Sequence, residues 1–544
     1  MKTQINILKD PWIVVSSLIA LSVLVPIAVI FVSSTGFEND LWMHLKQHLL
    51  PELISNTCKL SVGVLVLTCI LGVSLAFLTS LCDFPGRNFF SWSLLLPLAV
   101  PAYVMAFVYT GLFDFSGPVQ TGLRNYLPVA SVHFPEIRST GGVILVMSLA
   151  FYPYVFMLAS SAFTTQGEST VEASRSLGIG GIEQFFKVTF PMARPWIFAG
   201  LLLVLMETLA DFGTVSIFNY DTFTTAIYKA WFGFFSIGTA TRLSTILVLF
   251  IIVVIAVEHL TRKNMKYYKN QGDRNRQRLK LNGAKAILAM SYASLVFFMG
   301  FLIPVIQLAV WSISVFSEEF NMSYLELIKN SLLLAGSGAL LTIIFAIVLS
   351  SSERIHQNRF SRFITKISIL GYALPGTVLA VGLVKVISAA DKTIGYLGGL
   401  GNIQLPDQIF QGSVFVMVIG YMIRFMSAGF GSVSSSMNRI TPSMDEAAKS
   451  MGTSRFKILS TIHFPLIKSG VFTGLILVFV EVMKEMPITL MTRPFGWDTL
   501  AVKIFELTSE GEWERAALPA LVLIAVGILP VFLLTKQRGN RECS

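Results

Sequence analysis

Four carboxylates lie inside long apolar segments and form two pairs with the same spacing. The pairs are Glu207 with Asp211, and Glu481 with Glu485. Residues four positions apart share one face of a helix, and ionisable groups in membrane helices usually face the bundle interior or an aqueous path. These oxygen-rich side chains could line the route of a hard cation. They could equally form hydrogen bonds and ion pairs between helices, for which the nearby basic candidates are Lys484 and Arg424.

A segment of common design precedes each pair of carboxylates. The first copy reads VEASRSLGIGGIEQFFKVTFP over residues 171–191, and the second reads DEAAKSMGTSRFKILSTIHFP over residues 445–465. Each copy has a helix-forming Glu-Ala stretch, then a glycine six residues after the glutamate, and ends on Phe-Pro. Gly178 and Gly452 are positions where a chain can turn sharply. One amphipathic helix-turn-helix is typical of a membrane surface, whereas two copies at a fixed spacing favour docking sites for a two-fold partner.

Motifs for nucleotide binding and catalysis are missing from the sequence. No GxxxxGK phosphate loop occurs, because the dipeptide Gly-Lys is absent. No HExxH zinc motif is present, and His44 and His48, four residues apart, have no evident third ligand. We therefore assign no catalytic residue, metal ligand or cofactor to this chain, and an intramembrane enzyme is disfavoured.

Composition indicates a chain that is buried repeatedly in lipid. Hydrophobic residues make up 54% and charged residues 13%, whereas about a quarter of a soluble protein is charged. A membrane-spanning helix needs about 20 apolar residues, and backbone groups in lipid must bond within helices. We predict an all-α membrane protein with about 12 transmembrane helices near residues 12–32, 56–80, 90–113, 141–163, 196–218, 243–260, 286–312, 331–351, 364–388, 412–434, 469–491 and 516–535.

The distribution of Lys and Arg predicts that both termini are cytoplasmic. Short basic loops stay in the cytoplasm, and the stretch 261–285 holds nine Lys and Arg residues against one acid. The C-terminal tail is also basic, whereas the loop 33–52 is acidic or neutral and is expected outside. The basic stretch could bind anionic lipid or a partner, but we interpret it as a determinant of topology.

The chain contains an internal repeat with a constant offset of 274 residues. Matching pairs include Asn56 with Asn330, Pro101 with Pro375, Glu172 with Glu446, Pro191 with Pro465, Gly200 with Gly474, and Glu207 with Glu481. A constant offset over this distance indicates two copies with matched helices and loops. We predict a first repeat at 1–262, a basic cytoplasmic linker at 263–285 and a second repeat at 286–544. Six spans per copy imply two parallel repeats with a path between the halves.

Each of the two segments resembles the E-A-A-x3-G-x9-I-x-L-P loop of binding-protein-dependent ABC importer permeases. The second copy matches it at Glu446, Ala447, Ala448, Gly452, Ile462 and Pro465, and the first at Glu172, Ala173, Gly178 and Pro191. Departures are Ser174, Val188 and Phe190 in the first copy and Phe464 in the second. The resemblance implies that each cytoplasmic segment is a coupling helix that docks on an ABC ATPase subunit. ATP and magnesium would then bind to two partner subunits, and a periplasmic binding protein would deliver the substrate.

Among these permeases, the chain most resembles fused ferric-iron importers of the bacterial inner membrane. The segments that carry this resemblance are LPLAVPAYVMAFVY (96–109), GPVQTGLR (117–124), ETLADFGTV (207–215) and EVMKEMPITLMTRPFGWDTLA (481–501). It implies Fe³⁺ as cargo and alternating access as mechanism, with no nucleic acid as partner. Thiamine, a phosphonate or a polyamine is the alternative cargo. A twelve-helix secondary transporter, which would need no ATPase, is the alternative class.

Overall fold

The structure is a computed structural model that describes residues 10–36, 40–126, 136–165, 176, 178, 181–262, 278–400, 408–453 and 455–543. The chain forms two compact units. Unit 1 comprises Met1–Trp42, Ile227–Val248 and Glu318–Glu506, and unit 2 comprises Met43–Ala226, Leu249–Ser317 and Leu507–Ser544. Each unit therefore combines segments from both halves of the sequence. The predicted boundaries at 262 and 286 divide the sequence repeats rather than these units, and they stay a prediction.

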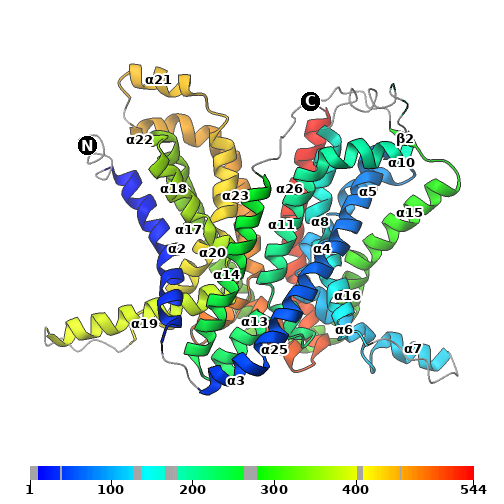
Figure 1. The fold of residues 1–544 in the computed structure, drawn as a ribbon, viewed down its shortest axis with the longest axis horizontal. Helices are drawn as coiled ribbons and strands as arrows, with labels where there is room; N and C mark the ends of the chain where they lie inside the picture. Colours follow the sequence, from blue (N-terminus) through cyan, green and yellow to red (C-terminus); the bar gives the residue numbers. More distant parts are fainter. Residues whose placement is uncertain are drawn as a thin grey trace. The chain divides into compact units, whose positions relative to one another are not determined.

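The elements of the first half follow the order shown in Figure 1. They are α2 (Pro11–Ser34), α3 (Asp40–His48), α4 (Leu50–Leu81), β1 (Cys82–Asp83), α5 (Arg87–Ser93), η1 (Leu96–Ala99), α6 (Ala102–Phe113), α7 (Pro118–Tyr126), α8 (Thr140–Thr165), α10 (Gly181–Gln184), η2 (Phe185–Thr189), α11 (Phe190–Ala210), α12 (Gly213–Ile217), α13 (Phe223–Tyr228), η3 (Lys229–Gly233) and α14 (Ile237–Arg262).

The second half matches the first in part of its order of elements. It contains β2 (Leu279–Lys280), α15 (Ala284–Phe297), η4 (Phe298–Leu302), α16 (Ile303–Glu319), α17 (Met322–His356), α18 (Arg359–Ser368), η5 (Leu370–Ala373), α19 (Gly376–Leu400), α20 (Val414–Met437), α21 (Pro442–Ser450), α22 (Arg455–Ile458), η6 (Leu459–His463), α23 (Phe464–Lys484), α24 (Pro487–Thr492), α25 (Leu500–Ser509) and α26 (Trp513–Cys543). Here η1 and η5 are 3₁₀ turns, and the other η elements are π-helical turns.

The predicted all-α architecture and number of membrane spans are confirmed. Among the described residues, 10 helices are long and apolar enough to cross a membrane, and two bent helix pairs raise the number to 12. The bent pairs join Arg87–Ala99 to Ala102–Asn125 at 91° and Arg359–Ala373 to Gly376–Gly398 at 115°. Pro101 and Pro375 stand at these two breaks, where proline removes a donor from the helical ladder. The spans predicted at 90–113 and 364–388 are therefore sharply broken helices.

The internal repeat is also visible in the element boundaries. Helix α23 begins and ends 274 residues after α11, η6 does the same relative to η2, and α22 does so relative to α10. The two copies of the chain therefore break their helices at matching positions.

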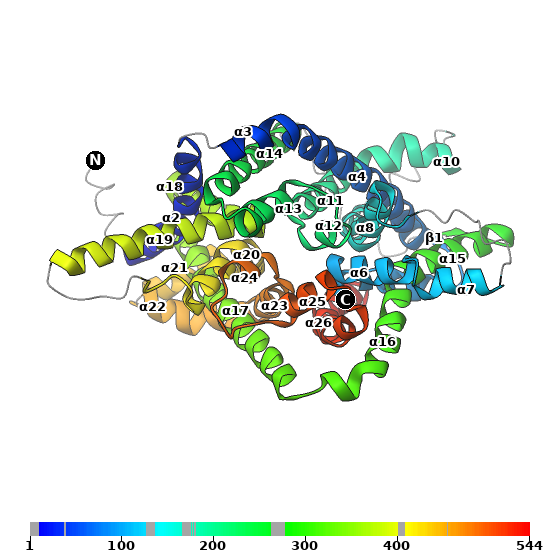
Figure 2. The same cartoon turned by 90° about the horizontal axis from the view of Figure 1, so that it is seen from below.

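Within unit 1, spans from distant parts of the sequence pack together. Helix α2 contacts α17, α18 and α19, and α17, α20 and α23 contact one another. Figure 2 shows α2 beside α18 and α19. The buried side chains Ile13 and Ala20 of α2 join Ile364 and Ile367 of α18 in one cluster. The N-terminal helix thus buries its apolar face on helices of the second repeat.

Unit 2 is built around α4, α8 and α11, which contact one another. Small residues allow this close packing, because a Cβ at Gly200 of α11 would lie 2.9 Å from the Val155 Cα of α8. Helix α26, at the end of the chain, packs on η1 and α6, and α15 packs on α5. Residues 82–83 and 279–280 form a short parallel pairing of β1 with β2.

Candidate functional site

We call residues 171–191 and 445–465 the two coupling segments, after the resemblance described above. The second one is a helix, a sharp turn and a second helix. Helix α21 ends at Ser450, and Gly452 follows with φ at +72°, a left-handed conformation that favours glycine. Short α22 and the π turn η6 then lead directly into span α23. The turn predicted at Gly452 is therefore confirmed, and the glycine is needed for its backbone conformation, since a Cβ there would meet no atom within 4 Å.

Residues of the predicted motif have different environments in α21. Glu446 and Ala447 are exposed, whereas Ala448 is buried at 1% exposure and fixes the inner face of the helix. Pro465 lies in the first turn of α23, directly after the π turn η6. The exposed positions leave one face of α21 available for contact, and the buried position attaches the other face to the unit.

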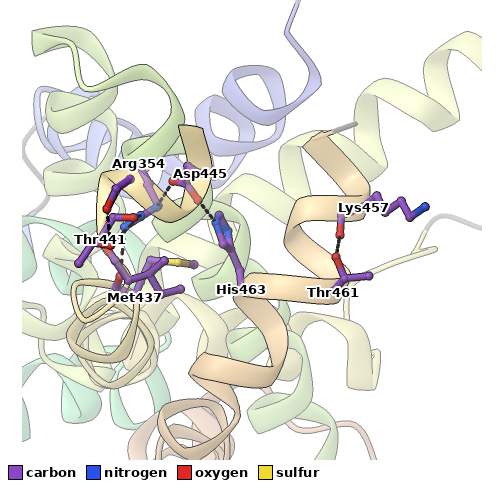
Figure 3. Close-up of polar contacts among 9 residues, drawn as sticks. Arg354, Met437, Thr441, Asp445, Lys457, Thr461 and His463 are labelled. Carbon is purple, nitrogen blue, oxygen red and sulfur yellow. Dashed lines mark hydrogen bonds and ion pairs between the residues drawn. The ribbon is translucent and has the colours of Figure 1, made fainter. Parts of the chain in front are cut away.

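Asp445 connects α21 to two other elements of unit 1 (Figure 3). Its Oδ2 atom accepts a hydrogen bond from Arg354 Nε of α17 at 2.9 Å, and its Oδ1 atom lies 2.7 Å from His463 Nε2 of η6. Partial burial opposes ionisation of Asp445, but the hydrogen bonds from His463 and Arg354 outweigh it and lower the pKa of Asp445. Asp445 is therefore ionised at neutral pH. We call Arg354, Asp445 and His463 the latch.

The first coupling segment is described only in part. Glu172 and Ala173 lie outside the described residues, and Gly178 has φ at +78°, which matches Gly452. The following π turn η2 packs through aromatic contacts: the ring centroid of Phe185 lies 4.8 Å from that of Phe77 in α4 and 6.1 Å from that of Phe163 in α8. Both segments thus turn at the predicted glycine. The first segment makes aromatic contacts within unit 2, whereas the second makes hydrogen bonds between charged side chains within unit 1.

A π-helical turn precedes the Phe-Pro pair in both copies. Pro191 and Pro465 each follow such a turn, η2 in one case and η6 in the other. Because proline cannot donate an N–H to the residue four positions earlier, the hydrogen-bond ladder must rearrange before it. The paired proline signal was readable in the sequence, but the π geometry was not.

The first pair of predicted carboxylates lies at the end of span α11. Glu207 is half-buried inside the helix, but Asp211 lies just beyond it, with ψ at 132°. Its carboxylate accepts hydrogen bonds from the Thr214 hydroxyl and backbone N–H, both at 2.9 Å, and from the Val215 N–H at 3.2 Å. The expectation that 196–218 is one continuous helix is therefore wrong, because Asp211 ends α11 and caps α12.

The second pair occupies the matching break in unit 1. Glu481 is exposed on α23, and Glu485 is buried just beyond its end. Glu485 Oε1 accepts the Ile488 N–H at 3.0 Å, and Oε2 lies 3.1 Å from Arg424 Nε. The predicted helix at 469–491 is thus also broken, again by a carboxylate that caps the next helix, α24. Arg424 is the basic partner considered from the sequence.

Sequence reasoning did not identify the latch. Asp445 directly precedes Glu446 in the motif, but Arg354 and His463 are 91 and 18 residues away from it in the chain. A signal was available, since the first repeat has Ser80, Val171 and Thr189 at the corresponding positions. Such a loss of ionisable groups between two copies could have marked the cluster.

Comparison with known proteins places the chain in a family. The family model described as binding-protein-dependent transport system inner membrane component matches residues 68–266 and again residues 338–541. The chain is 29% identical to the Fe(3+)-transport system permease protein FbpB 2 of Haemophilus influenzae, over 90% of each chain. It is 22% identical to the ferric transport system permease protein FbpB of Actinobacillus pleuropneumoniae, over 89% of this chain and 70% of that protein.

A shorter relative matches part of the chain. The sulfate transport system permease protein CysW of Escherichia coli is 27% identical over 36% of this chain and 66% of its own length. The duplicated family match agrees with the repeated coupling segments, and the apolar helices agree with a multi-pass protein of the inner membrane. The chain therefore belongs to the family of inner membrane components of binding-protein-dependent transport systems, and it carries two fused copies of the family's domain.

Proposed function

We propose that this chain is the permease of an ATP-driven ABC importer that carries ferric iron from the periplasm to the cytoplasm. The observation that carries the proposal is the pair of matching coupling segments, each with a glycine at positive φ and each followed by a π turn into a membrane span. Two equivalent segments fit a partner with two-fold symmetry. That partner would be a dimer of ABC ATPase subunits on the cytoplasmic side, where both termini of this chain would also lie.

The two coupling segments would transmit the work of ATP to the membrane helices. The exposed residues Glu446 and Ala447 would contact an ATPase subunit, with Glu172 and Ala173 doing so in the first copy. Gly178 and Gly452 would shape each turn, and Pro191 and Pro465 would fix the entry into the following span. ATP and magnesium would bind to the partner subunits. To switch between inward-open and outward-open states, nucleotide must favour one of them by about 5 kcal/mol.

Iron as cargo is supported by two separate observations. Relatives that match about nine tenths of the chain are named as ferric-iron permeases. In addition, Asp211 and Glu485 place carboxylate oxygens at matching helix breaks, and such oxygens are suitable ligands for hard cations. We propose that Glu207, Asp211, Glu481 and Glu485 line the path of the cation, with binding weak enough to permit release.

Reconstitution into proteoliposomes tests the proposed function. The permease is combined with its co-expressed ATPase and periplasmic binding protein, and uptake of radioactive Fe³⁺ is measured with ATP inside the vesicles. We expect uptake that requires both ATP and the ATPase subunit. Uptake at full rate from an ion gradient, without the ATPase, would instead identify a secondary transporter. Uptake of thiamine, a phosphonate or a polyamine in place of iron would overturn the cargo and keep the class.

The proposed path is tested separately from the energy source. The four carboxylates are replaced together by Gln or Asn, and assembly with the ATPase is checked by co-purification. We expect iron uptake to fall while the complex stays assembled. Unchanged uptake by the assembled variant would remove these side chains from the path and leave them as helix caps.

A further inference from the structure

The latch holds the coupling helix α21 at a junction of helix ends. Besides Asp445, Arg354 donates hydrogen bonds to the backbone carbonyls of Met437 at 3.2 Å, Ile440 at 3.0 Å and Thr441 at 3.3 Å. These carbonyls belong to the end of α20 and the connection that follows it, where a helix leaves acceptors without partners. One guanidinium at the end of α17 therefore fastens both the end of α20 and the first turn of α21.

His463 extends this junction to a third membrane span. It lies in η6, which continues directly into α23, and its imidazole contacts the same carboxylate that Arg354 holds. The side chains of Arg354, Asp445 and His463 are 14%, 18% and 9% exposed, so water screens the cluster less than it screens a surface ion pair. Through Asp445, helix α21 is thus connected to α17, α20 and α23, which pack on one another.

The first repeat cannot form this cluster. Positions 80, 171 and 189, which correspond to Arg354, Asp445 and His463, hold Ser, Val and Thr. The aromatic contacts of Phe185 with Phe77 and Phe163 occupy the corresponding region of unit 2. In the second repeat, positions 351 and 437, which match Phe77 and Phe163, hold Ser and Met. The contacts of the two segments, as far as the structure describes them, thus differ in chemistry.

We propose that Arg354, Asp445 and His463 are positioning residues that make the second coupling helix move as one body with its three membrane spans. In the described part of the first repeat, the aromatic packing of Phe185 would serve the attachment, whereas the second repeat depends on these ionised groups. This inference rests on the proposed coupling to an ATPase. Without the latch, α21 could follow the ATPase while the spans stay in place, and ATP would be hydrolysed without transport.

The test uses the complete transporter with its ATPase and binding protein in proteoliposomes. Asp445→Asn keeps the shape of the side chain but removes its charge. We expect the ATP hydrolysed per imported Fe³⁺ to rise about fivefold or more, since hydrogen bonds to charged groups are the stronger ones. Asp83→Asn is the matched control: Asp83 pairs with Arg87 at 3.6 Å near the corresponding end of α4, but its side chain is 54% exposed. We expect that control to match the wild type.

Four further variants separate positioning from simple stability. Arg354→Gln should raise the ATP cost per ion at least as much as Asp445→Asn, because Arg354 also holds the carbonyls at the end of α20. The double variant should cost less than the two single effects added together, because both substitutions break the same Arg354–Asp445 contact. His463→Gln, which keeps a donor for Asp445, should restore part of the coupling that His463→Ala loses. Additive effects in the double variant, or a lowered melting temperature with normal coupling, would contradict the positioning role.

The outcome also distinguishes this inference from the proposed function. If the wild-type complex imports no cargo with ATP, the proposed function fails and the latch has nothing to position. If the wild type imports iron and Asp445→Asn has the wild-type ATP cost, the latch proposal alone is overturned.

Discussion

Two carboxylates at matching positions are stabilised by different chemistry. Asp211 receives three hydrogen bonds from Thr214 and Val215, and Ala150 stands where the second repeat has Arg424. Glu485 receives one backbone N–H and a cation. A charge in a membrane helix needs partners, and the two repeats supply them by separate substitutions. Both repeats thus have a carboxylate at this position, but only Glu485 has an arginine at the position of Arg424 as its counter-charge.

At the residue scale, Arg424→Met should destabilise the protein strongly. The side chains of Arg424 and Glu485 are 12% and 5% exposed, and Arg424 also donates to the Leu374 carbonyl at 2.7 Å. Removing one partner of a buried ion pair costs about 3–5 kcal/mol, because the other charge is left uncompensated. Thermal unfolding in detergent measures the loss.

A second substitution should recover part of that stability. Adding Glu485→Gln to Arg424→Met removes the uncompensated charge and keeps an acceptor for the Ile488 N–H, so the double variant should melt above the single one. The exposed Arg138→Met is the control and should change little. A double variant that melts below the single one would contradict the pairing.

At the element scale, the sharp turn of the second coupling segment depends on one glycine. Gly452→Val should force a left-handed conformation on a residue with a Cβ, at a cost of about 1–2 kcal/mol, and the turn should open. Since a Cβ at this position meets nothing within 4 Å, the effect is one of backbone conformation and not of a clash. We expect the variant to reach the membrane but to hydrolyse ATP without a matching import of iron.

The matched control for this variant is Gly431→Ala. Gly431 lies within α20, has no positive φ, and also has open space around its Cβ position. Alanine favours a helix over glycine there, so both coupling and stability should be kept. Normal coupling in Gly452→Val would show that the turn can form without glycine.

The elements show what the sequence could predict and what it could not. The length of the apolar segments predicted the membrane spans. The 274-residue offset predicted which span of the first repeat corresponds to which span of the second. Both signals depend on local composition and on the order of residues in the chain. The breaks at Asp211 and Glu485 could not be predicted, since apolar residues continue past both of them. Whether a polar residue interrupts a span depends on partners such as Thr214 or Arg424, and these are set by tertiary packing. The latch was missed for the same reason.

At the scale of the whole chain, the two compact units do not follow the two sequence repeats. Unit 1 contains α2 and part of α14 from the first half, and α2 packs with helices of the second half. Unit 2 contains α15 and α26 from the second half, packed with helices of the first. In the described part of the chain, each half thus has helices that pack on helices of the other half. In domain-swapped dimers, exchanged segments of this kind hold two separate chains together without a covalent link between them.

Cutting the linker should therefore leave the two halves associated. A protease site inserted between residues 270 and 271, with an affinity tag on the C-terminal half, allows cleavage of the purified protein in detergent. We expect both fragments to stay on the affinity column, because α2 remains buried on α17, α18 and α19. The uncleaved protein serves as the control. Elution of the N-terminal fragment by itself would mean that the exchanged helices contribute little and that the linker holds the halves together.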